Sequence, residues 1–303
     1  MHKEDLVSMD REAALRRERK GDDIAGGQAI IEGVMMRHGD RVASAVRRPD
    51  GGIEIREEDY RPLAKRYPPL GWPFVRGFVT LLEMMILGMR SLMFSAEVAL
   101  SEEEEKPKPW QLTLTVMTSV ALVLLGFVVV PAYCFTLLKG VIASTFVLNI
   151  LEGLIRLSLF LLFLSSTLLM EDMKRVFMYH GAEHKTVFAW EDGRDLTVAN
   201  VRPYSTRHPR CGTSFILVVM IVSILVFSLL GRPDFLHRVV YKLALLPVVA
   251  GISYEAIRFT GRHRGRGWVR ALSWPGLLLQ RVTTREPTDD QIEVAIEAMK
   301  RVV

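Results

Sequence analysis

The stretch LTLTVMTSVALVLLGFVVVPAYCFTLL, residues 112–138, decides the fold class of this chain. It runs for 27 residues without a single charged side chain. A helix rises about 1.5 Å per residue, so this run is long enough to cross the roughly 30 Å hydrocarbon core of a lipid bilayer. An uncharged segment of this length is typical of a transmembrane helix and indicates a membrane protein.

Three further apolar runs follow at 143–170, 214–230 and 239–257. Short loops separate the first run from the second and the third from the fourth, as expected for antiparallel pairs of spanning helices. The sequence therefore predicts an α-helical integral membrane protein with four transmembrane helices in two hairpins, 111–170 and 213–258. Half of the 303 residues are hydrophobic, which agrees with this class.

Lysine and arginine are distributed unevenly between the two sides of this predicted bundle. The central loop, 171–212, and the basic, amphipathic C-terminal segment, 259–303, are rich in both residues. The opposite loops, 139–142 and 231–238, hold only Lys139, Arg232 and Arg238. By the positive-inside rule, the central loop and both termini are cytoplasmic. The net charge of +5 then reflects affinity for a bilayer with anionic headgroups rather than for nucleic acid.

The region before the first span is predicted to stay in the cytoplasm. Residues 1–25 mix acidic and basic side chains without an apolar core, which is typical of a disordered arm and unlike a signal peptide. In the β-rich segment 26–70, RVASAVRR (41–48) and GIEIREE (52–58) flank the turn Pro49-Asp50-Gly51 and predict a β-hairpin. The fold class therefore includes a small cytoplasmic α+β portion with an N-terminal β-hairpin.

Residues 71–100 form an apolar segment of a different kind. Charged side chains recur there every seven residues and so share one helical face: Arg76, Glu83, Arg90 and Glu97. We expect an amphipathic helix that lies in the cytoplasmic membrane interface, with an ordinary surface helix as the alternative. A charged linker, 101–110, leads to the first span. Near the C-terminus, Thr288 and Gln291 predict a capping box that opens a final amphipathic helix.

The stretch YHGAEHKTVFAW, residues 179–190, carries the chemically informative residues of the central loop. On a helix, His180 and His184 lie about 40° apart and project from one face, so both imidazoles can bind one metal ion. Glu183 could reach a water molecule on that ion, as in the H-x-x-E-H motif of one class of zinc hydrolases. The alternative is a pair of interfacial histidines beside a charged loop.

Three more candidate ligands lie at the same predicted depth. RHPRCGTS supplies His208 and Cys211, and both imidazole and thiolate bind zinc. Glu255 is an acid at the cytoplasmic end of the fourth span, where an ionised group is paired or functional. Structural roles are the alternative for each, including an ion pair between Glu255 and Arg258 or Arg262. The sequence thus predicts a divalent metal site, most simply for zinc, drawn from His180, His184, His208, Cys211 and Glu255.

Six blocks of this sequence are long enough to be specific: GGQAIIEGVMMR, AVRRPDG, YHGAEHKTV, TVANVRPYSTRHPRCGTSF, SYEAIRF and TTREPTDDQIEVAI. Together they resemble the YqhQ-like family of bacterial membrane proteins, which are described as predicted metal-dependent enzymes. The resemblance covers nearly everything from Gly26 to the C-terminus. It implies a multi-pass protein of the bacterial inner membrane with a metal site at His180, His184 and the His208–Cys211 block. It implies no substrate.

Two functions fit these residues. In the first, a membrane-embedded metal-dependent hydrolase uses Glu183 as its catalytic base on a membrane peptide or lipid-linked substrate. In the second, a non-enzymatic scaffold or assembly factor uses His180, His184, His208 and Cys211 to close a structural zinc site. Glu183 has no role in a structural site, so its presence favours the enzyme. The sequence leaves the reaction, the native metal and the oligomeric state open.

Overall fold

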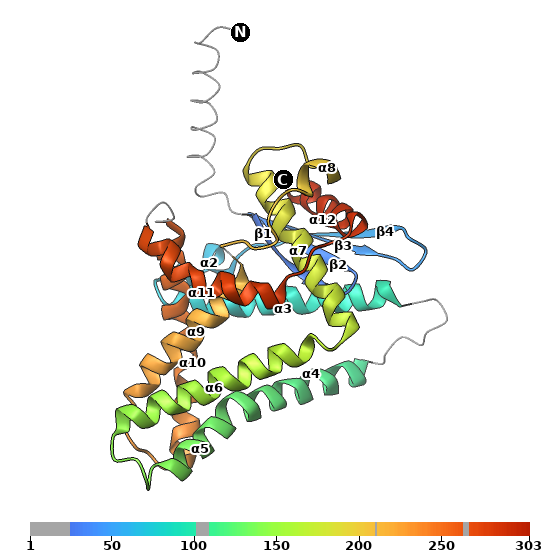
Figure 1. Cartoon of the computed structure of the whole chain (residues 1–303). Coiled ribbons are helices and arrows are strands. Elements are labelled where there is room, and N and C mark those ends of the chain that lie inside the picture. Colours follow the sequence, from blue (N-terminus) through green and yellow to red (C-terminus); the bar gives the residue numbers. More distant parts are fainter. Residues whose placement is uncertain (1–24, 101–108, 210, 263–266) are drawn as a thin grey trace, which may run out of the picture.

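The structure, a computed structural model, describes residues 25–100, 109–209, 211–262 and 267–303 (Figure 1). The predicted arm, apart from its last residue, and most of the predicted linker lie outside the described residues. The described chain has two parts, a small sheet covered by helices and a bundle of long apolar helices. The chain passes from the sheet into the bundle and returns to the sheet at its C-terminal end.

The sheet is an antiparallel meander in which each strand pairs with the next along the chain. The predicted hairpin is confirmed, because the third strand pairs with the fourth around a turn where Gly51 has a positive φ of 87°. The sequence did not predict the first hairpin, since its turn holds Ile31 and Glu32 rather than typical turn residues. The strands are β1 (Ala25–Ile30), β2 (Gly33–His38), β3 (Arg41–Arg47) and β4 (Ile53–Asp59).

Helices cover both faces of the sheet. On one face lie α7 (Glu171–Glu191) and α12 (Asp289–Val302), and on the other lies α3 (Val75–Ala99). Side chains alternate along β2, so Met36 joins the core with α7 and α12 while Met35 joins the core with α3. Burial on both sides explains why this strand has the apolar sequence of a central strand.

The bundle contains all four predicted apolar runs as helices. The first is interrupted by a π-helical turn, and the other three are continuous. The helices are α4 (Pro109–Leu124), the π-turn η2 (Leu125–Val129), α5 (Val130–Leu138), α6 (Thr145–Thr167), α9 (Gly212–Ser228) and α10 (Phe235–Arg262).

Four described helices are long and apolar enough to cross a membrane, which identifies the chain as a membrane protein. They are Thr113–Leu138, Thr145–Thr167, Phe235–Thr260 and, in addition, α3. The sequence predicted four spans but counted α9 in place of α3. α9 is apolar but has only 17 residues, or about 25 Å, which is near the lower limit for a spanning helix.

α3 lies between the sheet and α10 (Figure 1). Gly88 lets the side chain of Gln28 approach from β1, and Gly77 lets Tyr254 approach from α10. The Ser95 hydroxyl accepts a hydrogen bond from the Ile31 amide at 3.2 Å. Large apolar side chains on the rest of the helix surface are exposed: Leu82, Met85, Ile86, Met89 and Met93. The structure thus gives α3 one face toward protein and one apolar face without a described partner.

The remaining elements connect the bundle to the sheet. The first half of the predicted central loop is the helix α7, and the short α8 (Val198–Val201) follows it. After α10, the helix α11 (Gly267–Thr283) packs on α9, and the predicted capping box of Thr288 and Gln291 is confirmed at the start of α12. Two short elements precede α3, α2 (Leu63–Arg66) and the 3-10 turn η1 (Pro68–Gly71).

Candidate metal centre

α7 and the N-terminus of α9 bring three predicted ligands together. One ligand atom from each of His180, His184 and Cys211 lies within 4.8 Å of the other two, and we call these residues the His–Cys cluster. Helical spacing places the two histidines on one face of α7, as the sequence predicted. Among the described residues this group includes none of Glu183, His208 and Glu255.

A backbone carbonyl fixes the orientation of the His180 ring. Its Nδ1 lies 2.8 Å from the carbonyl oxygen of Thr283, at the end of α11. A carbonyl oxygen only accepts hydrogen bonds, so Nδ1 carries the proton and Nε2 keeps a free lone pair. That Nε2 lies 3.1 Å from the sulfur of Cys211.

The ring of His184 is held in the same way. Its Nδ1 donates to the carbonyl oxygen of Thr206 at 2.5 Å. Its Nε2 is buried and has no hydrogen-bond partner among the described residues, so a polar atom there is left unsatisfied. Burial lowers the pKa of His184, which keeps the imidazole neutral as a metal ligand must be. A backbone partner on Nδ1 is the usual way in which proteins orient a metal-binding histidine.

Cys211 is the N-cap residue of α9. Its sulfur accepts a hydrogen bond from the Thr213 amide at 3.4 Å, and the residue is only 9% exposed. The free N–H groups of a helix N-terminus favour negative charge, and thiolate is the form of cysteine that binds metals. Two imidazole nitrogens and one thiolate are a ligand set that zinc accepts, so the residues present fit the predicted ion.

Glu183 lies next to the cluster and contacts the sheet. Its Oε1 accepts a hydrogen bond from the Gly27 amide of β1 at 3.1 Å, and the residue is 6% exposed. Burial raises the pKa of this carboxyl, against the lowering effect of His180 and His208. Sequence reasoning did not identify Gly27 as part of the site. The paired glycines at the start of β1 are the signal that a close backbone approach is needed there.

His208 lies beside the cluster without joining it. Its ring centre is 5.8 Å from that of His184, and its Nε2 is 3.6 Å from a carboxylate oxygen of Glu191. Gln280 of α11 fixes the His208 backbone, accepting from its N–H at 2.8 Å and donating to its carbonyl at 2.9 Å. Gln280 is fully buried and was not identified from the sequence.

Glu255 is not among the three residues of the His–Cys cluster and pairs with Arg76. Its two carboxylate oxygens accept hydrogen bonds from Arg76 at 2.6 and 2.5 Å. Because α10 packs against α3, the nearest cation is on α3 rather than one turn ahead at Arg258. Glu255 therefore forms an ion pair, as the structural alternative predicted, but its partner is Arg76 rather than Arg258 or Arg262.

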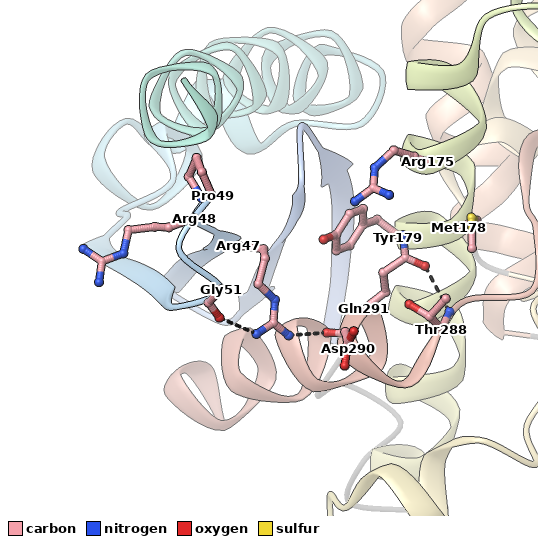
Figure 2. Close-up of a pocket in the computed structure, with 10 residues that line it drawn as sticks. All are labelled: Arg47, Arg48, Pro49, Gly51, Arg175, Met178, Tyr179, Thr288, Asp290 and Gln291. Atoms are coloured by element: carbon pink, nitrogen blue, oxygen red, sulfur yellow. Dashed lines mark hydrogen bonds between the residues drawn. The ribbon is translucent and has the colours of Figure 1, made fainter. Parts of the chain in front are cut away.

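A pocket of about 530 Å³ opens elsewhere, between the β3–β4 turn and the starts of α7 and α12 (Figure 2). Arg47 lies at its edge and donates to the carbonyl oxygens of Gly51 and Asp290 at 2.9 and 2.7 Å. None of its lining residues belongs to the His–Cys cluster: Arg47, Arg48, Pro49, Gly51, Arg175, Met178, Tyr179, Thr288, Asp290 and Gln291.

Comparison with known proteins agrees with the resemblance seen in the sequence. The family model described as "Protein of unknown function (DUF1385)" matches residues 72–303. The "Uncharacterized protein YqhQ" of Bacillus subtilis (strain 168) is 36% identical over an alignment of 298 positions, and the match covers 92% of each chain. No solved structure matches the chain significantly. The chain therefore belongs to the DUF1385 family and is a YqhQ-like membrane protein.

Proposed function

We propose that this protein binds a divalent metal ion, zinc in the simplest case, through the His–Cys cluster and acts as a metal-dependent hydrolase. The observation that carries the proposal is the orientation of the two histidines. Each Nδ1 is held by a backbone carbonyl, which leaves both Nε2 lone pairs for an ion near the sulfur of Cys211.

The number of ligands favours an enzyme over a scaffold. A catalytic zinc site has three protein ligands and an open position, whereas a structural site has four protein ligands. The His–Cys cluster supplies three. His208, the fourth ligand required by the scaffold hypothesis, is outside this group, and its Nε2 lies 3.6 Å from a carboxylate oxygen of Glu191.

Glu183 supplies the acid–base group of the proposed reaction. The Gly27 amide holds one carboxylate oxygen, so the second is available to take a proton from an attacking water molecule. When bound, the metal would supply Lewis-acid polarisation of the substrate's carbonyl or phosphoryl oxygen. The amide of Gly27 orients the carboxylate throughout and so reduces the number of conformations that Glu183 samples.

The substrate class follows from the position of the site relative to the bundle. Cys211 caps α9, an apolar helix of the bundle, and α7 begins four residues after α6 ends. A substrate that reaches these residues is a membrane peptide or a lipid-linked molecule at the cytoplasmic face of a bacterial inner membrane. The positive-inside rule supports this orientation, because the basic segments lie on the side of α7.

Metal content is the first test. Purified wild-type protein should contain about one equivalent of a transition metal by elemental analysis, and His184→Ala should lose it. His237→Ala is the matched control, because His237 is an exposed histidine on α10 that pairs with Asp234. A metal-free wild-type protein, or a His237→Ala variant that loses metal equally, would contradict the proposal.

Glu183→Gln separates the enzyme from the scaffold. Glutamine keeps an oxygen for the Gly27 amide but cannot act as a base, so this variant should retain its metal and thermal stability. Under the hydrolase proposal it should nevertheless show the phenotype of a gene deletion when it replaces the wild-type protein in cells. Full complementation by Glu183→Gln would rule out catalysis by this residue and favour a structural zinc site.

A further inference from the structure

A second cluster of charged side chains lies inside the apolar bundle, at the end far from the His–Cys cluster. Glu152 and Arg156 come from α6, and Arg238 and Lys242 from α10. Their exposed fractions are 3%, 8%, 0% and 1%, respectively, so all four are closed off from solvent. Charged groups are costly in a membrane-spanning bundle and are usually functional. We call these four residues the bundle charge cluster.

The cluster carries an excess of positive charge. Glu152 Oε2 lies 2.5 Å from Arg238, Glu152 Oε1 pairs with Lys242, and the same Oε1 is 3.7 Å from Arg156. Three cations thus share one carboxylate, which gives a net charge of +2 when all four groups are ionised. Among the described residues, no second carboxylate pairs with any of the three cations.

Neutral oxygens accept four further hydrogen bonds from the two arginines. Arg156 donates to the Phe127 carbonyl at 2.9 Å and to the Ser223 hydroxyl at 3.0 Å. The Phe127 carbonyl needs such a partner because Pro131, four residues later, has no N–H to donate to it. Arg238 donates to the Asn149 side chain at 2.5 Å and to the Gly231 carbonyl at 3.3 Å. These dipoles accept hydrogen bonds but do not cancel the charge.

Aromatic rings provide only partial compensation. The guanidinium carbon of Arg238 is 3.3 Å from the centre of the Phe135 ring, while Arg156 and Lys242 lie 5.1 and 5.6 Å from that of Phe227. Such contacts stabilise a cation by less than an uncompensated buried ion costs. A bound anion would remove the remaining imbalance.

The cluster is nearest to the short loops that join the bundle helices. Arg238 contacts the carbonyl of Gly231 in the α9–α10 loop, and Arg232 of that loop bonds to the carbonyl of Ile142 in the α5–α6 loop. Both loops lie at the end of the bundle far from the sheet (Figure 1). An anion would therefore enter from the side of the membrane opposite to the His–Cys cluster.

We propose that the bundle charge cluster binds a small monovalent anion, with chloride as the probe. The burial of the four side chains requires the anion to shed its water on entry. That desolvation cost rises with the square of the charge, so a monovalent ion is favoured over sulfate or phosphate. The site does not depend on the metal centre and goes beyond the proposed hydrolase.

The first experiment compares anions with the purified full-length protein at constant ionic strength. Replacing gluconate by chloride should raise the Tm of the wild type by about 2–4 °C in a saturable manner, because a ligand that binds only the folded state stabilises it. Sulfate should not reproduce this shift. Equal Tm values in gluconate and chloride, or an equal rise with sulfate, would overturn the proposal.

Two substitutions of opposite sign test whether the shift arises in this cluster. Lys242→Met lowers the excess charge and should abolish the chloride response. Glu152→Gln raises it and should increase the chloride affinity, on the order of tenfold. Lys139→Met, in the α5–α6 loop, is the control and should respond like the wild type. If either variant fails to fold, a crystal of the wild-type protein grown with bromide instead of chloride tests the site. The absence of an anomalous bromide signal beside Lys242 would refute it.

Discussion

At the scale of single residues, Gly27 determines where a functional side chain can lie. A Cβ atom at this position would meet the Met35 carbonyl oxygen at 2.4 Å and the carboxyl carbon of Glu183 at 3.2 Å. The first contact is with backbone, which cannot move without disrupting the β1–β2 pairing. Only glycine therefore allows β1 to donate its amide to Glu183 at this point.

We expect Gly27→Ala to lower the stability of the protein by roughly 1–3 kcal/mol, the cost of overpacking, because the added Cβ would clash with the Met35 backbone. Gly26→Ala is a matched control, because nothing lies within 4 Å of a Cβ added at Gly26. Thermal unfolding of the two detergent-solubilised variants measures the difference. Equal stability of both variants would show that β1 adapts to the extra methyl group.

At the scale of elements, α3 combines features of a spanning helix and of an interfacial one. Its length and composition are sufficient to cross a membrane. However, Ser91 on one face bonds to Ser44 of β3, and Glu83 accepts the amide of Leu63, so that face contacts the sheet and its linker. A helix packed along a polar domain stays with that domain, and we expect α3 to lie flat in the cytoplasmic interface with Ile86 toward lipid.

Depth-dependent fluorescence quenching tests the position of α3. A bimane label on Ile86→Cys, in a Cys134→Ser background, should be quenched best by lipids brominated near the headgroup. The same label on Leu125→Cys, an exposed position in the middle of the first span, should be quenched best by lipids brominated deep in the acyl chain. Deep quenching at both positions would mean that α3 crosses the bilayer.

At the scale of the whole molecule, the two polar sites lie at opposite ends of one bundle. The His–Cys cluster joins α7 to the first turn of α9, whereas the bundle charge cluster lies near the loop after α9. α9 and α10 run between the two ends, as Figure 1 shows. If the positive-inside rule sets the orientation, the first site faces the cytoplasm and the second faces the other side of the membrane.

Cysteine accessibility tests this orientation. Val141 is 85% exposed in the α5–α6 loop, so Val141→Cys should react with an impermeant thiol reagent in intact cells. Val303→Cys, at the end of the chain, should react only after the membrane is permeabilised. The Cys134→Ser background, which still contains the buried Cys211, provides the blank. The reverse pattern would place the metal site on the outer side.

The sequence by itself determined the features that depend on neighbouring residues along the chain. The uncharged run 112–138 is long enough to cross a bilayer wherever it packs, and the four-residue spacing of His180 and His184 places both rings on one helical face. The β3–β4 turn and the capping box at Thr288 also depend only on residues that are close together in the sequence. Each of these predictions is confirmed by the structure.

Only the tertiary structure decided which distant groups meet. Glu255 had Arg258 one turn away and Arg262 two turns away in sequence but pairs with Arg76, because α3 packs against α10. Cys211 approaches His180, whereas His208, three residues earlier, lies beside the cluster with its backbone N–H and carbonyl bonded to Gln280 of α11. A charged or metal-binding side chain acts over only a few ångströms, so its partner depends on how whole elements pack, which local sequence does not specify.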